Sequence, residues 1–198
     1  FTVPAVDAAL MNAGTKIWLT QTTSKYFYVA SISGTTITID VNADYTLANA
    51  AITAPYFSNA ESPVGFPAEF TWTSTLTNIS GGTTNYSKYK RDGKKISLRW
   101  KYTLAGAGVG SEASISPPVT MASDYASDDY LNASVTFYDV SALTGYTGVA
   151  RIESTTKINL RCIHTDGTRA TNQAASSTNP FTFANGDVLQ IHATCVAA

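Results

Sequence analysis

The chain has 198 residues, of which 44% are hydrophobic and 11% aromatic, so it can form one large or two small domains with buried cores. Thr, Ser, Ala, Val, Ile and Tyr dominate, whereas the helix-favouring Leu, Glu, Lys and Gln are sparse, and this balance favours β-strands. A formal charge of -1, with 14% charged residues, excludes the overall field that would attract nucleic acid or an anionic membrane, and no apolar run reaches the roughly 18 residues that span a bilayer.

Residues 1–55 predict a small β-meander domain. It contains three short β-branched or aromatic runs, separated by polar turns. These runs are Ile17–Leu19, Tyr26–Val29 and Ile37–Val41. The Ala-rich segment from Ala43 to Ala54 has room for one helical turn. Residues 56–69, with proline and glycine among Ser, Asn and Glu, predict a linker that lets two domains engage separate surfaces.

Residues 70–198 predict a β-sandwich or jelly-roll domain, so the expected fold class is all-β. The clearest strand runs from Lys95 to Leu104, where apolar and polar residues alternate, with Trp100 on the core face and Arg99 on the solvent face. The segment from Thr168 to Thr178, rich in Ala, Ser, Thr and Asn, predicts an exposed loop. Further strands are predicted at Ser114–Ser116, Ser134–Val140, Val149–Glu153, Lys157–His164 and Val188–Val196.

Cysteine and histidine are too scarce to indicate a metal centre. Cys162 and Cys195 lie in apolar, strand-like segments, where we expect buried free thiols, with a single disulfide as the alternative. Cys162 and His164 share one strand face, but His192 and Cys195 are three positions apart and face opposite sides, so a four-ligand zinc site would need a bulge. The sequence therefore predicts no metal and no other cofactor.

Catalytic signatures are equally sparse, and we expect the protein not to be an enzyme. The G-x-S-x-G string of nucleophile-elbow hydrolases does not occur, and the glycine-rich stretch at 106–110 lacks the Lys-Ser/Thr of a phosphate-binding loop. Asp124, Asp128 and Asp129 offer carboxylates for glycoside cleavage or for a surface calcium ion. Such residues among Ser, Tyr and Ala are more often turn formers.

A basic cluster extends from Lys88 to Lys101 and holds seven of the thirteen basic residues, with aromatic residues interleaved. Interleaving of this kind occurs in proteins that bind single-stranded nucleic acid. Here Trp100 and Tyr102 alternate with Arg99 and Lys101, so rings and charges lie on opposite strand faces. We therefore expect no nucleic-acid partner, and interpret the cluster as a solvated face or a contact with acidic loops of another subunit. The candidate interaction residues here are Lys88, Lys90, Arg91, Arg99 and Lys101.

Four short motifs follow one another in the second half of the chain. Trp72–Thr77 contains the pattern W-x-x-T-L, and Tyr86 with Tyr89–Lys94 contains Y-x-R-x-G before the long amphipathic strand. Ile115–Val119 contains I-S-x-P, and Phe181–Ile191 contains a Gly-Asp pair at the start of the last strand. Their order resembles that of a β-sandwich domain that recurs at the ends of bacteriophage tail-fibre, head-fibre and capsid decoration or cement proteins.

This resemblance covers about residues 70–198, and it implies a β-sandwich that trimerises about its own axis and serves a virion, without catalytic residues to carry over. The shaft of full tail fibres is missing, so we expect a homotrimeric capsid decoration, cement or head-fibre protein. Its first domain would bind a major capsid or tail protein. The alternative is a tail-fibre receptor-binding or carbohydrate-binding protein that holds a host glycan on exposed rings. The candidate rings are Tyr125, Tyr130 and Tyr146.

Overall fold

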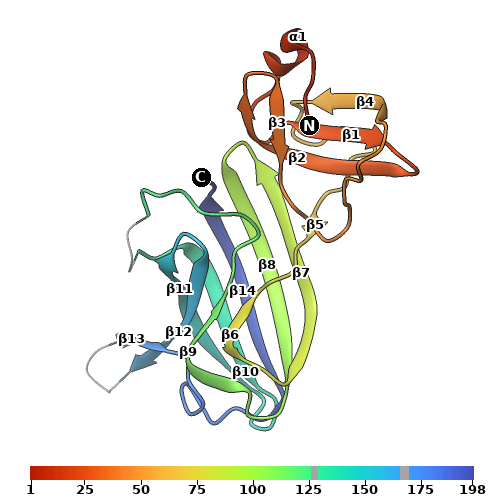
Figure 1. Cartoon of the computed structure of the whole chain (residues 1–198). Coiled ribbons are helices and arrows are strands. Elements are labelled where there is room, and N and C mark those ends of the chain that lie inside the picture. Colours follow the sequence, from red (N-terminus) through yellow and green to blue (C-terminus); the bar gives the residue numbers. More distant parts are fainter. Residues whose placement is uncertain (126–128, 166–169) are drawn as a thin grey trace.

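The computed structural model describes residues 1–125, 129–165 and 170–198, and the fold is nearly all β, as the composition predicts. The described strands form two antiparallel sheets, a small one near the N-terminus and a larger curled one (Figure 1). The result is a sandwich-like architecture, in which the small sheet sits at one end of the larger one.

The small sheet has the strand order β3-β2-β1-β4. Its strands are β1 (Lys16–Thr20), β2 (Ser24–Ser33), β3 (Thr36–Ile39) and β4 (Thr53–Ser58). One face of this sheet packs Ile17, Leu19, Val29 and Ile37 into a core with the single helical turn α1 (Ala5–Ala8). The three predicted strands are confirmed, whereas α1 was not expected because one turn is too short to show a helical period.

Two predictions for the segment after β3 are wrong. The linker predicted at residues 56–69 begins too early, because residues 56–58 complete β4 at the edge of the small sheet. Pro55 is tolerated there, since an edge strand has one side without a pairing partner. The helical turn predicted from Ala43 to Ala54 does not form in these described residues. Instead, the Asn42 side chain accepts hydrogen bonds from the backbone N–H groups two and three residues later and makes a turn.

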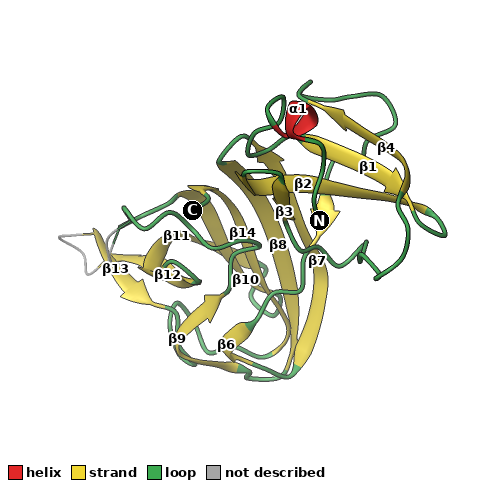
Figure 2. Ribbon diagram, turned by 45° about the horizontal axis from the view of Figure 1, so that its top comes forward, coloured by secondary structure: helices red, strands yellow, loops and turns green. Residues whose placement is uncertain are grey.

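The larger sheet has the order β5-β7-β8-β14-β10-β11-β12-β9-β6, with β13 paired to β12, and Figure 2 shows its strands curling around a common interior. The strands in the described residues are β5 (Phe70–Thr71), β6 (Leu76–Ile79), β7 (Gly82–Asp92), β8 (Lys95–Ala105), β9 (Val109–Ile115), β10 (Asn132–Asp139), β11 (Thr144–Ser154), β12 (Lys157–Thr165), β13 (Ala170–Ala174) and β14 (Asn185–Val196). Residues 168 and 169 of the loop predicted from Thr168 to Thr178 lie outside the described residues. The prediction is wrong for residues 170–174, which form β13 and pair with β12 through backbone hydrogen bonds that need no particular side chains.

The segment between β5 and β6 closes the curl. The backbone N–H of Trp72 donates to Ser87 O on β7 at 3.2 Å, and the N–H of Ser116, just after β9, donates to Thr75 O at 2.9 Å. The Trp72 indole N–H also reaches Ser116 O at 3.3 Å. One short segment therefore joins the β7 side of the sheet to the β9 side.

The alternation predicted for β8 is confirmed. Trp100 is 0% exposed, stacks on Tyr102 with ring centroids 5.6 Å apart, and donates from its indole N–H to Ser74 Oγ at 3.0 Å. Arg99, the residue before Trp100, is exposed on the other face. Apolar side chains of β14 and β10, such as Ile191 and Phe137, complete the interior that Trp100 faces.

Both cysteines are free and buried, as predicted. Burial raises the pKa of the Cys162 thiol, and it raises that of Cys195 to about 12. Both side chains pack as small hydrophobic groups of the interior, so the disulfide alternative is excluded for this structure.

An aromatic cluster fills the junction between the two sheets. Tyr28 of β2 meets Phe70 of β5 edge to face, with ring centroids 4.9 Å apart. Phe66, in the connecting segment, lies 5.5 Å from Tyr28 and 5.6 Å from Phe70, and Tyr89 of β7 lies 6.1 Å from Phe70. Tyr28 is 1% exposed, and Phe70 and Tyr89 are 0% exposed. The two sheets therefore share buried aromatic packing and are not joined by the linker alone.

A buried ion pair crosses the same junction. Arg91 of β7 is 1% exposed, and its Nη1 donates to both carboxylate oxygens of Asp40, at 2.6 and 2.8 Å. The guanidinium also donates to the carbonyls of Gly93 and Ala30. Burial raises the pKa of the Asp40 carboxyl, and the Arg91 charge opposes that rise. The expectation that Arg91 lies on an interaction surface is therefore wrong, because the small sheet covers this end of β7.

The backbone approaches closely beside this pair. Gly14 adopts φ +87°, and a Cβ at this position would lie 2.3 Å from the backbone nitrogen of Gly93. The turn before β1 therefore packs directly against the turn of the β7–β8 hairpin, and only glycine fits at position 14.

We expect Trp100→Ala to lower the free energy of unfolding by roughly 3 to 5 kcal/mol, because it empties a fully buried site. Arg99→Ala should lower it by no more than about 1 kcal/mol, since its ion pair with Glu69 is partly exposed. Urea denaturation followed by circular dichroism measures both values. Equal losses would show that the faces of β8 are assigned wrongly.

Asp40→Ala and Arg91→Ala should each lower the free energy of unfolding by roughly 3 to 5 kcal/mol, because each leaves a buried charge without its partner. The double variant Asp40→Ala/Arg91→Ala removes both charges and should lose much less than the sum of the two single variants. The same denaturation experiment on all four proteins gives the coupling. Additive losses would contradict a coupled pair.

Candidate functional site

Four of the five predicted basic interaction residues lie together on the outward face of β7 and β8. Lys88 and Lys90 belong to β7, Arg99 and Lys101 belong to β8, and strand pairing places Lys88 opposite Arg99. Arg99 is exposed and the three lysines are half-buried. These four residues are called the basic sheet face below. Arg91 is excluded from it by burial.

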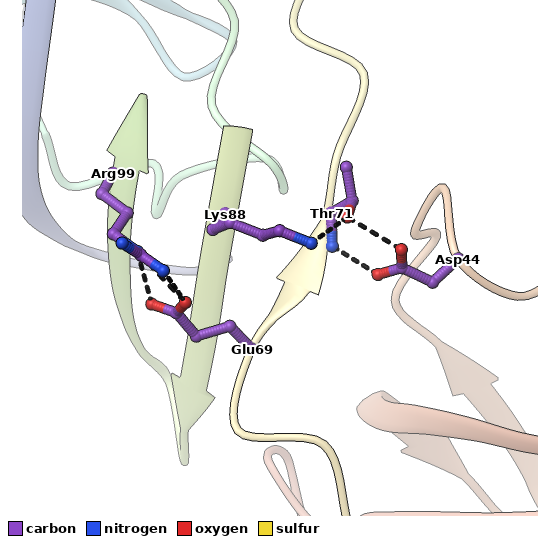
Figure 3. A network of polar contacts seen from close by, with 5 residues as sticks. All are labelled: Asp44, Glu69, Thr71, Lys88 and Arg99. Atoms are coloured by element: carbon purple, nitrogen blue, oxygen red, sulfur yellow. Dashed lines mark hydrogen bonds and ion pairs between the residues drawn. The ribbon is translucent and has the colours of Figure 1, made fainter. Parts of the chain in front are cut away.

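A polar network ties this face to the connecting segment and to the first domain (Figure 3). The Arg99 Nε donates to both carboxylate oxygens of Glu69, at 2.9 and 3.1 Å. Lys88 donates to Thr71 Oγ1, and that hydroxyl donates to Asp44 Oδ1 at 2.8 Å. The chain of contacts therefore holds the basic sheet face at a fixed position relative to the loop after β3.

Two open grooves lie beside residues of the basic sheet face, the first lined by Arg99 and the second by Lys88. The first, of about 410 Å³, lies over β8, β14 and β10, and the second, of about 470 Å³, lies between β7 and the segment after β5. Residues 71–74 and 84–88 line the second groove, with Tyr86 and Lys88 among them. The hydrogen-bonding side chains of the first groove are Glu69, Ser97, Arg99, Asn132, Ser134, His192 and Thr194. Hydroxyl, amide and charged groups recur in both linings, so both grooves suit a polar ligand.

Two contacts orient the Arg99 side chain. Its guanidinium carbon lies 5.3 Å from the centroid of the Tyr86 ring, and Glu69 accepts its hydrogen bonds on another side. Hydrogen bonds to Glu69 raise the pKa of Arg99 further above its usual range. A permanently charged, oriented guanidinium beside hydroxyl and amide groups can bind a carboxylate or a polyhydroxylated surface through hydrogen bonds.

The three candidate tyrosines are not brought together. Tyr125 is half-buried, and its hydroxyl accepts a hydrogen bond from the N–H of Val196 at 3.0 Å. Tyr130 is 50% exposed, and Tyr146 is half-buried against Phe181, with centroids 5.1 Å apart. No ring contact joins any two of these tyrosines in the described residues, so they form no shared stacking platform there.

The histidines and acidic residues occupy separate places. His192 is exposed and contacts Gln190 at 2.9 Å, whereas Cys195 is buried, so the predicted opposite orientation of these two residues is confirmed. Asp128 and the side chain of His164 lie outside the described residues. Asp124 and Asp129 are described, and the backbone carbonyl of Asp129 accepts a hydrogen bond from the N–H of Ile152.

Several residues that line the grooves or contact the basic sheet face were not among the interaction residues predicted from the sequence. His192 was considered only as a possible metal ligand, although its alternation with the apolar Ile191 and Ala193 indicates a position on the solvent face of β14. Glu69 and Thr71 gave no such signal, since they belong to a connecting segment whose position depends on the junction. In the portions of the chain that are described, no group of three or more His, Cys, Asp or Glu residues is arranged to hold a metal ion.

None of the helices in the described portions is long and apolar enough to cross a membrane. Comparisons with models of protein families, with curated proteins and with solved structures return no match.

Proposed function

We propose that this chain is a non-enzymatic structural protein of a bacteriophage virion, and specifically a homotrimeric capsid decoration, cement or head-fibre protein. The observation that carries this proposal is the buried junction, in which Arg91, Asp40 and the aromatic cluster couple two sheets into one body. An attachment protein needs such coupling, because binding at one end must fix the direction of the other. The resemblance of residues 70–198 to virion domains supplies the biological context.

The first domain offers a surface for attachment at the end that carries α1. Val6 and Leu10 are 69% and 57% exposed there, and α1 lies on the side of the small sheet that faces away from the larger sheet (Figure 1). Exposed apolar residues that gather on one surface often mark protein contacts. In this proposal the α1 end binds a major capsid or tail protein, and the basic sheet face projects away from it.

Glycan binding, as in a tail-fibre receptor-binding or carbohydrate-binding protein, is the second candidate. The grooves beside Arg99 favour it, because their hydroxyl, amide and guanidinium groups match the hydrogen-bonding needs of a sugar. Tyr86 provides the aromatic ring there, in place of the tyrosines named from the sequence. Loss of glycan binding in Arg99→Ala and Asn132→Ala would support this candidate.

We expect light scattering at micromolar concentration to give three times the mass of the chain, because the resembled domains assemble about a three-fold axis. The measurement is made after size-exclusion chromatography at two salt concentrations. A monomer under both conditions would contradict a trimer that forms independently of a particle.

The double variant Val6→Asp/Leu10→Asp should bind purified phage particles at least tenfold more weakly than the parent, because it places charges on the proposed contact. Its melting temperature should remain close to that of the parent, since both side chains are exposed. Val64→Asp is the matched control, as Val64 is 99% exposed on the connecting segment. A co-sedimentation assay measures binding, and equal binding by the double variant would place the attachment surface elsewhere.

A further inference from the structure

A separate cavity of about 340 Å³ lies where the small sheet meets β7 and the connecting segment. Lys16 of β1, Tyr28 of β2 and Lys90 of β7 contribute to its lining, and residues 61–63 and 66–69 complete it. This volume falls at the lower end of the range for small-molecule pockets, roughly 300 to 1,000 Å³. The cavity is therefore large enough for a compact ligand.

Lys16 is the unusual residue of this cavity. It is 3% exposed, and no hydrogen bond or ion pair involves its Nζ in the described parts of the chain. The Nζ lies 6.0 Å from the centroid of the Tyr28 ring, at the outer limit of a cation–π contact. Burial lowers the pKa of Lys16, while Asp92 and Glu61 oppose this effect and Lys90 adds to it. The Nζ is not fully enclosed by protein atoms, so this ammonium group, which has no protein partner in the described residues, is accessible to a ligand that enters the cavity.

The other charges around the cavity already have partners. Lys90 Nζ lies 3.2 Å from Glu61 Oε1, and both carboxylate oxygens of Glu69 accept hydrogen bonds from Arg99. The Glu61 side chain is 72% exposed, so it marks the rim of the cavity. The one charge that lacks a direct counter-ion among these lining residues is that of Lys16.

We infer that this cavity binds a small monocarboxylic acid, whose carboxylate pairs with Lys16 Nζ. Phe66 and the prolines at 63 and 67, which are partly exposed, form walls against which a ring body packs, and Ser62 and Glu61 offer hydrogen-bonding groups for hydroxyls. Carboxylates at the rim disfavour a doubly charged phosphate, because repulsion grows with ligand charge. A hexuronic acid, a sugar ring with one carboxylate, combines these features. This inference does not depend on the virion role proposed above.

Isothermal titration calorimetry of the full chain with glucuronate tests the inference, with glucose and inorganic phosphate as comparison ligands. Glucuronate should bind, and Lys16→Met, which keeps the length of the side chain but removes its charge, should weaken binding tenfold or more. Lys157→Met is the matched control, since Lys157 pairs with Glu153 and is not among the lining residues. No glucuronate binding, equal binding of glucose, or unchanged binding in Lys16→Met would overturn the inference.

Thermal unfolding provides a second readout. Lys16→Met should not lower the melting temperature, because the Nζ has no hydrogen bond or ion pair to lose in the described residues and is not fully enclosed by protein atoms. Glucuronate should raise the melting temperature of the parent but not that of the variant. A lower melting temperature in Lys16→Met would show that the charge is structural and would refute the inference. Particle binding is measured separately, so failure here leaves the proposed virion function untouched.

Discussion

The buried ion pair between Arg91 and Asp40 is the contact on which the arrangement of the two sheets depends. Both side chains are removed from water, so each requires the other to avoid an uncompensated charge. The guanidinium also donates to the carbonyls of Gly93, in the turn between β7 and β8, and of Ala30, in β2 of the small sheet. These bonds join residues of both sheets at one point of the junction. The ion pair therefore helps to fix the position of the small sheet relative to β7, because its hydrogen bonds are directional and aromatic packing is less so.

This fixed junction also creates the candidate binding surfaces. Glu69 and Thr71 reach the basic sheet face because the connecting segment is held between the sheets, where Phe66 and Phe70 are packed. The cavity around Lys16 has the same origin, since β1 supplies the lysine and β7 supplies the opposite wall. Both surfaces combine residues from distant parts of the chain. A change that loosens the junction should therefore disturb both of them together.

The polar surface around Arg99 is preorganised for binding. Arg99 is oriented by a carboxylate and a ring before any partner arrives, so little side-chain entropy remains to be lost on binding. The exposed apolar residues near α1 provide a surface of different chemistry at the far end of the small sheet. Two unlike surfaces held by one rigid junction are consistent with a protein that connects a particle to its surroundings, as proposed.

The sequence by itself determined the all-β fold, the two faces of β8 and the burial of Cys162 and Cys195, because alternation with a period of two is a local property that each strand displays alone. It also identified the basic residues that form the sheet face. Tertiary structure decided that Arg91 is buried, since its partner Asp40 lies 51 positions earlier and no local pattern links them. It likewise decided the pairing of β13 and the isolation of Lys16, because pairing partners and cavities arise only where separate strands meet.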